Sequence, residues 1–139
     1  MINFNYVSDF QLNKEKIFRF WIEKCCDSEG YSVGELNYIF CNDNYLLEIN
    51  KRYLDHEDFT DIITFDYVHG KIVSGDIYIS EERVRENAKI FKVDFENEIQ
   101  RVMAHGILHL MGFKDKTEED VAVMRLKEEE KIKLFHVEP

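Results

Sequence analysis

The feature that most restricts the fold is a change at Ser80 in the period of the apolar residues. Before Ser80, apolar and polar residues alternate as they do in strands, in segments 2–7, 33–41, 61–68 and 72–80. After it, apolar residues recur at helical spacing through 80–92, 94–111 and 117–135. Strands followed by a run of helices favour the α+β class over an alternating α/β fold.

Two further helices are predicted between the strands, at residues 12–26 and 43–54, the second with Asn42 as its N-cap. His69 and Gly70 are typical of a hairpin turn between the last two strands. The predicted order is therefore β-α-β-α-β-β-α-α-α, an α+β fold in which a small mixed four-stranded sheet packs against helices. In the last helix, Thr117 and Asp120 resemble a capping box, and pairs such as Glu128 with Lys131 are spaced to stabilise it.

Length and composition indicate one domain. The chain has 139 residues, of which 45% are hydrophobic, and this is enough for one core. It contains one proline, six glycines and no low-complexity tract, so no linker divides it. We predict a single domain over residues 1–139.

Charge and hydropathy exclude several classes of function. No stretch approaches the length that spans a membrane, and the N-terminal residues do not resemble a signal peptide, so we expect a cytoplasmic protein. The formal net charge of −10 argues against a broad basic surface for nucleic acid. Cys25, Cys26 and Cys41 have neither metal-finger spacing nor disulfide density, and we expect all three to be reduced.

The segment "AHGILHLMGFKD" carries the candidate chemistry. Because a helix turns about 100° per residue, His105 and His109 lie on one face and can share a metal ion. Gly112 allows a left-handed turn that brings Asp115 back towards them. These offsets match the metzincin pattern, with aspartate in place of its third histidine. Three protein ligands and a water molecule are typical of a catalytic zinc site.

Gly106 occupies the place where metzincin-like peptidases carry their glutamate general base. The peptide-hydrolysis machinery is therefore incomplete. A glycine inside a helix costs about 1 kcal/mol relative to alanine, which indicates either close approach of a backbone or substrate, or close packing of the helix.

The segment "HGILHLMGFKD" resembles the signature H-G-x-L-H-L-x-G-Y-D-H of the YbeY family of metal-dependent endoribonucleases, which act in bacterial ribosomal RNA maturation. "GDIYIS" at 75–80 is similar to the family's G-D-I strand, and "INKRYLDHEDFTDIITF" at 49–65 to its N-x-x-Y-R…T-D/N-V-L-S-F segment. The resemblance covers residues 49 to about 132. It implies a metal helix like that of the zincins and metzincins.

Carried over residue by residue, the resemblance implies metal ligation by His105, His109 and Asp115. In an alternative alignment Lys116 takes the ligand's place, and a protonated lysine cannot bind a metal. The third ligand would then be sought among the remaining histidines, which are His56, His69 and His136. Zinc is the expected ion, one per chain, although a carboxylate ligand leaves nickel, iron or manganese open.

The chain departs from the family pattern at Leu54, where the family has an arginine thought to meet RNA phosphate. Arg52 is the nearby candidate substitute as a catalytic residue, although it lies on a different side of a helix. A local basic stripe formed by Arg85, Lys89 and Lys92 is the candidate RNA-binding surface, and its binding would be salt-sensitive.

The leading hypothesis is a metal-dependent, single-strand-specific endoribonuclease that processes small-subunit ribosomal RNA in ribosome maturation and quality control. Its expected partners are ribosomal RNA and the small ribosomal subunit, with no membrane. One alternative is a metallopeptidase with metzincin-like spacing. The other is a catalytically weakened, ribosome-associated binding module whose acidic surface meets a basic ribosomal or assembly protein.

Overall fold

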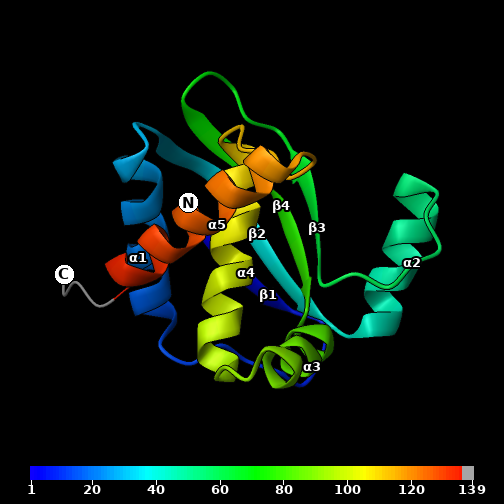
Figure 1. The fold of residues 1–139 in the computed structure, drawn as a ribbon. Helices are drawn as coiled ribbons and strands as arrows, with labels where there is room; N and C mark the ends of the chain where they lie inside the picture. Colours follow the sequence, from blue (N-terminus) through cyan, green and yellow to red (C-terminus); the bar gives the residue numbers. More distant parts are fainter. Residues whose placement is uncertain (136–139) are drawn as a thin grey trace.

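The computed structural model describes residues 1–135 and has a four-stranded mixed sheet at its centre (Figure 1). The strands are β1 (Ile2–Tyr6), β2 (Ser32–Cys41), β3 (Ile62–Asp66) and β4 (Ile72–Ser80), in the spatial order β1-β2-β4-β3. The pairs β1/β2 and β2/β4 are parallel and β3/β4 is antiparallel. The α+β class, the mixed four-stranded sheet and the predicted order of elements are confirmed.

Helices α1 (Glu15–Ser28), α4 (Phe95–Leu110) and α5 (Glu118–Leu134) share one main hydrophobic core with the sheet. Helix α4 runs across the sheet and is covered by its neighbours, as its nearly continuous apolar sequence requires (Figure 1). Gly106 lets α4 approach the sheet, because a Cβ there would lie 3.0 Å from side-chain atoms of both Ile62 and Ile77. Of the two interpretations of this glycine, close packing of the helix is therefore the correct one.

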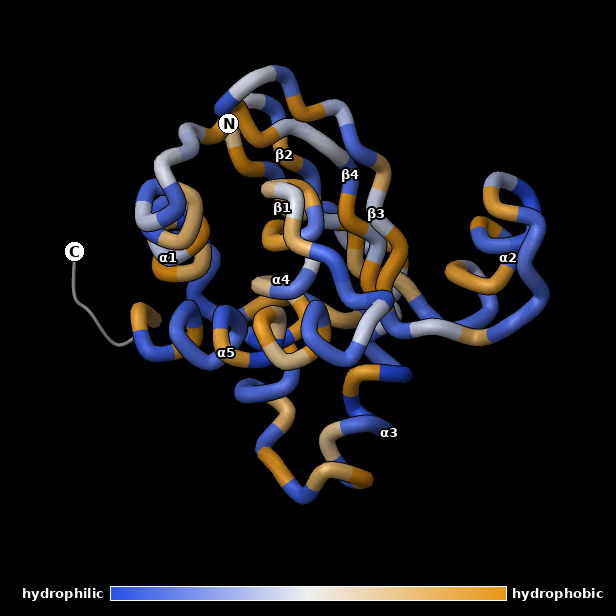
Figure 2. Tube along the Cα trace, turned by 45° about the horizontal axis from the view of Figure 1, so that its top comes forward, coloured by the Kyte–Doolittle hydropathy of each residue, from blue (hydrophilic) through white to orange (hydrophobic). Residues whose placement is uncertain are grey.

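Helix α2 (Asp43–Leu54) packs against the other face of the sheet, where Leu46 meets Cys41 and Ile63 in a small second core. The alternation along β3 separates the two faces, since Ile62 contacts α4 while Ile63 belongs to the α2 side. Figure 2 shows α2 standing apart from α1, α4 and α5. Helix α3 (Glu81–Phe91) follows β4 directly and packs mainly on α4.

The local signals for turns and caps are confirmed. The Asn42 side chain accepts a hydrogen bond from the Tyr45 amide, and Thr117 forms the capping box with Asp120. His69 lies in the β3–β4 hairpin, where it bridges to Ile72.

The predicted pairing of Glu128 with Lys131 is wrong. Both side chains are buried and have other partners: Glu128 contacts α4, whereas Lys131 reaches Glu29 on the loop after α1. The three cysteines are free and buried, as expected. Within residues 1–135, none of the helices combines the length and apolarity needed to cross a membrane.

Candidate metal centre

Helix α4 carries His105 and His109 one turn apart, with their ring centroids 4.5 Å from each other. Both side chains are partly buried beside the sheet. The rings are nearly perpendicular, with an interplanar angle of 85°. The two histidines therefore lie on one face of the helix, as their spacing predicted. The helix that carries them is held in place by the hydrophobic core.

The chain reverses after α4 at Gly112, whose φ of 96° is in the left-handed region that favours glycine. The amide of Gly112 donates to the carbonyl of His109, and the amide of Phe113 donates to that of Leu108. These bonds close the end of the helix and turn the following residues back along it. Asp115 consequently lies against the two histidines.

Three potential ligand atoms converge at this point. Oδ2 of Asp115 lies 3.1 Å from Nε2 of His109 and 3.4 Å from Nε2 of His105. The ligand atoms of all three residues lie within 4.8 Å of one another. Among residues 1–135, this is the one group of three or more histidine, cysteine or acidic side chains close enough to hold a metal ion. Ligands about 2.0–2.1 Å from a tetrahedral zinc ion lie roughly 3.3–3.4 Å apart. The two distances to Oδ2 of Asp115 are close to this spacing, and imidazole nitrogen and carboxylate oxygen are both ligands that zinc accepts.

The other ring nitrogens determine which atoms face this point. Nδ1 of His109 lies 3.0 Å from the carbonyl oxygen of Phe113, which can only accept, so Nδ1 donates. Nδ1 of His105 lies 2.6 Å from Oε2 of Glu128 and donates to that carboxylate. In neutral rings, both Nε2 atoms then present lone pairs towards a carboxylate oxygen that also only accepts. Such a convergence requires either a proton or a cation between these atoms.

The three residues line one side of a cavity of about 500 Å³. Its other walls are the end of α2 with Asn50 and Leu54, most of the loop 55–61, and β3. Asp58 and Asp61 add acidic groups, whereas the lining formed by the described residues contains no lysine or arginine. The cavity is acidic, and a bound cation would be its main positive charge.

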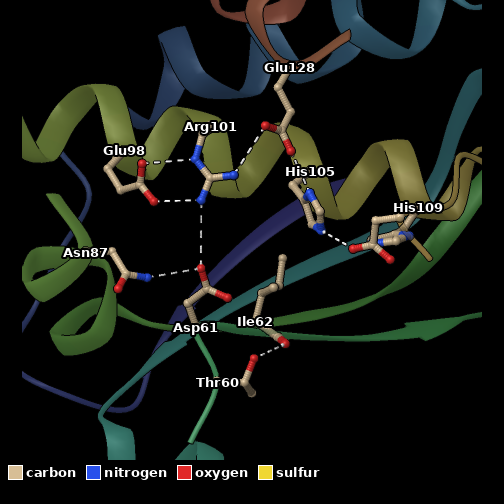
Figure 3. A network of polar contacts seen from close by, with 10 residues as sticks. Thr60, Asp61, Ile62, Asn87, Glu98, Arg101, His105, His109 and Glu128 are labelled. Atoms are coloured by element: carbon tan, nitrogen blue, oxygen red, sulfur yellow. Dashed lines mark hydrogen bonds and ion pairs between the residues drawn. The ribbon is translucent and has the colours of Figure 1, made fainter. Parts of the chain in front are cut away.

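A buried ionic network lies behind His105 (Figure 3). Arg101, on α4, donates to both carboxylate oxygens of Glu98, at 3.0 and 2.7 Å, and its Nη1 lies 3.2 Å from Oε1 of Glu128. Its Nη2 lies 3.9 Å from Oδ2 of Asp61 in the cavity wall. This network connects α5, α4 and the start of β3 to a candidate ligand.

Burial and charge act in opposite directions on the carboxyl groups of this network. Burial alone would raise the pKa of Glu128, but the hydrogen bond from His105 and the charge of Arg101 hold that pKa below its ordinary value. Burial raises the pKa of Asp61, and the more distant Arg101 offsets this only in part. Glu128 is therefore a firmly ionised acceptor at neutral pH.

The structure does not place the other predicted site residues in this cavity. Arg52 is exposed and lines a separate pocket with Tyr45, Tyr53 and Tyr78. On α3, Arg85 donates to Glu81 and stacks over the Phe95 ring. Lys89 and Lys92 are exposed, and neither belongs to the cavity lining. Their roles in catalysis and RNA binding stay predictions.

The alternative third ligands also lie apart from the ligand group. His56 lines the cavity but lies outside the 4.8 Å group, and His69 is exposed in the hairpin. Lys116 is exposed, and His136 lies outside the described residues. Of these candidates, Asp115 alone joins the two histidines.

Sequence reasoning missed Glu128 and Arg101, which contact the site from behind. Glu128 lies 23 residues from His105, and no local spacing connects the two. One signal was available, because Met124, Glu128 and Lys131 recur at i, i+4 and i+7 and form the buried stripe of α5. A glutamate and a lysine on the same stripe as a buried methionine require buried partners.

Fold and site together define a small α+β protein with a candidate centre of two histidines and an aspartate at the end of a buried helix. The family model described as "Endoribonuclease YbeY" matches residues 3–136. The Flavobacterium psychrophilum protein named Endoribonuclease YbeY is 58% identical over 137 residues, covering 99% of this chain and 98% of that protein. The protein of the same name from Flavobacterium johnsoniae is 55% identical over 138 residues, covering 99% of each chain.

A solved structure supports the same assignment. The protein TM1509 from Thermotoga maritima, known from a solution structure, is 26% identical in sequence to this chain. The structural alignment covers 97% of this chain and 89% of the TM1509 chain, with a TM-score of 0.69. The chain belongs to the endoribonuclease YbeY family, a family of nuclease enzymes. The resemblance and the enzyme class predicted from the sequence are confirmed.

Proposed function

We propose that this protein is a metal-dependent endoribonuclease that binds one zinc ion through His105, His109 and Asp115 and cleaves single-stranded RNA. We further propose that its substrate is ribosomal RNA of the small subunit, in the cytoplasm; this part rests on the family resemblance. The observation that carries the proposal is the convergence of the two Nε2 atoms and Oδ2 of Asp115. Relatives named Endoribonuclease YbeY support the choice of RNA as substrate.

Bound at this site, a zinc ion would supply Lewis-acid chemistry, which polarises a phosphodiester and lowers the pKa of a water molecule. The residues of the chain supply the rest of the site. Helix α4 holds the histidines against the core, and the turn at Gly112 positions Asp115. The adjacent cavity of about 500 Å³ leaves space for part of a substrate beside the ligands.

The metallopeptidase alternative is weakened by the position of residue 106. Gly106 packs against Ile62 and Ile77, so a larger side chain there would collide with the sheet. A glutamate general base cannot be accommodated at that position without rearranging the core. The match to the family of endoribonucleases favours the nuclease over both alternatives.

The test measures metal content and RNA cleavage in the same preparations of wild type, His109→Ala, Asp115→Ala and His69→Ala. We expect about one zinc per chain and chelator-sensitive cleavage of single-stranded RNA in the wild type and in His69→Ala, the matched control with an exposed histidine. Both ligand substitutions should remove metal and cleavage together. Chelator-sensitive digestion of casein without RNA cleavage would favour the metallopeptidase, and folded wild type that takes up no metal would favour the binding module.

A second test concerns the missing positive charge in the cavity. Leu54 lines the cavity and is 42% exposed, so an arginine there can extend into solvent and face RNA phosphate. We expect Leu54→Arg to lower the KM for single-stranded RNA several-fold at low salt, with less effect at high salt. An unchanged KM would argue that RNA does not pass this wall.

A further inference from the structure

Glu128 contacts a candidate metal ligand on the side of the ring that faces away from the other two. Its Oε2 lies 2.6 Å from Nδ1 of His105, and its side chain is only 3% exposed. Its other oxygen, Oε1, lies 3.2 Å from the guanidinium of Arg101 (Figure 3). Each carboxylate oxygen of Glu128 thus has one donor, and the two donors together hold the carboxylate in one orientation.

The two candidate histidines differ in what restrains them. Nδ1 of His109 donates to a neutral backbone carbonyl in its own turn, that of Phe113. Nδ1 of His105 donates to a carboxylate on another helix, and that carboxylate also pairs with the Arg101 guanidinium at 3.2 Å. A hydrogen bond to a charged acceptor is about twice as strong as one between neutral groups. His105 therefore has the stronger restraint and the more electron-rich ring.

The network around Glu128 also carries more negative than positive charge. Among the ion pairs of residues 1–135, Arg101 is the cation shared by three carboxylates, those of Asp61, Glu98 and Glu128. Glu128 also contacts the imidazole of His105. Glu98 and Glu128 are almost completely buried, so solvent screens them little. An excess of buried negative charge beside three converging ligand atoms favours a cation at that point.

We propose that Glu128 is a positioning residue for the metal ligand His105. By accepting the proton on Nδ1, it fixes the tautomer whose Nε2 lone pair points towards Asp115, and its charge strengthens Nε2 as a donor. Arg101, 3.2 Å from the other oxygen of Glu128, holds this carboxylate in place. The proposal rests on the metal site proposed above, and it adds a residue of α5 that acts on the metal through His105.

The experiment measures the Kd for zinc by competition with a chromophoric chelator, using the metal alone as probe. Glu128→Gln keeps the length of the side chain and an acceptor oxygen but removes the charge, whereas Glu128→Asp keeps the charge and loses reach. We expect both to weaken zinc binding by about 10–100-fold, the usual effect of losing such a partner. The control Glu129→Gln alters the exposed neighbouring glutamate and should stay within about twofold of wild type.

A purely structural role is separated by measuring affinity where each apo variant is fully folded, as judged by circular dichroism. With cobalt(II) in place of zinc, the visible absorption of Glu128→Gln should also shift relative to wild type, because the donor strength of His105 changes. Wild-type affinity and an unchanged cobalt spectrum in both folded Glu128 variants would overturn the proposal. Wild type that binds no zinc would instead overturn the metal site itself, and this inference with it.

Discussion

Helix α5 takes part in two ionic clusters about one turn apart, centred on the buried side chains of Glu128 and Lys131, and the clusters differ in their balance of charge. In the first, Arg101 faces three carboxylates, and one of these, Glu128, contacts a candidate ligand. In the second, Lys131 and Lys127 face two carboxylates, Glu29 and Glu130. The second cluster is balanced and ties the end of α1 to α5, whereas the first keeps an excess of negative charge beside the converging ligand atoms.

This difference in charge balance gives the two clusters different roles. The charges of a balanced cluster can be satisfied within the protein. The Trp21 indole, which donates to the carbonyl of Lys131 at 2.6 Å, adds a further contact at the same junction. A cluster with an excess of buried negative charge raises the free energy of the folded state until a cation binds next to it. We therefore expect the Lys131 cluster to affect folding stability alone, and the Glu128 cluster to affect the metal site.

The largest expected effect is stabilisation by zinc. When the free concentration of a metal that binds only the folded chain is about 1,000 times its Kd, the free energy of unfolding rises by about 4 kcal/mol. We expect this increase in wild type and in Glu29→Gln, and its loss in Asp115→Ala. Denaturant unfolding with and without zinc measures it. A Glu29→Gln protein that loses the zinc effect would contradict the division between the two clusters.

Next in size is the loss of the buried lysine. Lys131 is 0% exposed, and its Nζ lies 2.5 Å from Oε2 of Glu29 and 2.8 Å from Oε1 of Glu130. Lys131→Met fills the space but leaves Glu29 with Lys127 alone, so we expect a loss of about 3 kcal/mol in the free energy of unfolding. The exposed Lys133→Met is the control and should change stability by less than about 0.5 kcal/mol. The Kd for zinc should stay at the wild-type value in both, and a tenfold change in Lys131→Met would show that the clusters are coupled.

The pH dependence of the Lys131 cluster should be smaller and has a definite sign. Burial alone would raise the pKa of Glu29, but hydrogen bonds from Lys127 and Lys131 outweigh it and leave that pKa below the ordinary value. The stabilisation from Glu29 is therefore complete above the ordinary glutamate pKa of about 4.3 and is lost as the pH falls through the lowered pKa of the folded state. Burial alone would lower the pKa of Lys131, but its hydrogen bonds to Glu130 and Glu29 raise it, so its contribution is complete below about pH 10.4 and is lost at higher pH.

The measurement is the difference in unfolding free energy between wild type and Glu29→Gln across the pH range, on zinc-free protein. We expect a constant difference between about pH 5 and 10 that declines below it. A difference that instead grew as the pH fell would mean that Glu29 is not held ionised by the lysines. Zinc-free samples are needed because protonation of ligands would otherwise contribute.

Much of this fold could be predicted because its signals are local. The alternation in β2 and β4, the helical spacing after Ser80 and the caps at Asn42 and Thr117 each depend on residues close together in the chain. The candidate ligands were accessible for the same reason, because a helix face and one glycine turn bring positions 105, 109 and 115 together.

The surroundings of the site could not be predicted in this way. The contact from Glu128 to His105 depends on how α5 crosses α4, and the helical pattern of α5 fitted a surface ion pair equally well. Likewise, Arg52 lies near Leu54 in the chain, yet it lines a different pocket because neighbouring positions on a helix point in different directions. Contacts between distant elements require the packed structure.

The smallest predicted effect tests whether the Glu128 cluster depends on α5 as a whole or on its local contacts. Thr117 Oγ1 accepts from the Asp120 amide at 3.0 Å, and Oδ2 of Asp120 accepts from the Thr117 amide at 3.4 Å. Thr117→Ala should cost about 1 kcal/mol of unfolding free energy by fraying the first turn, while Thr117→Ser should keep the cap.

Glu128 lies roughly 16 Å further along the helix at 1.5 Å per residue, and Arg101 and His105 hold it there. The Kd for zinc should therefore change by less than about twofold, because fraying is confined to the end of a helix and the charge imbalance around Arg101 is unaffected. A tenfold weakening in Thr117→Ala, without a change in Thr117→Ser, would mean that the N-terminal turn of α5 sets the position of Glu128 or of Asp115, which lies two residues before the cap.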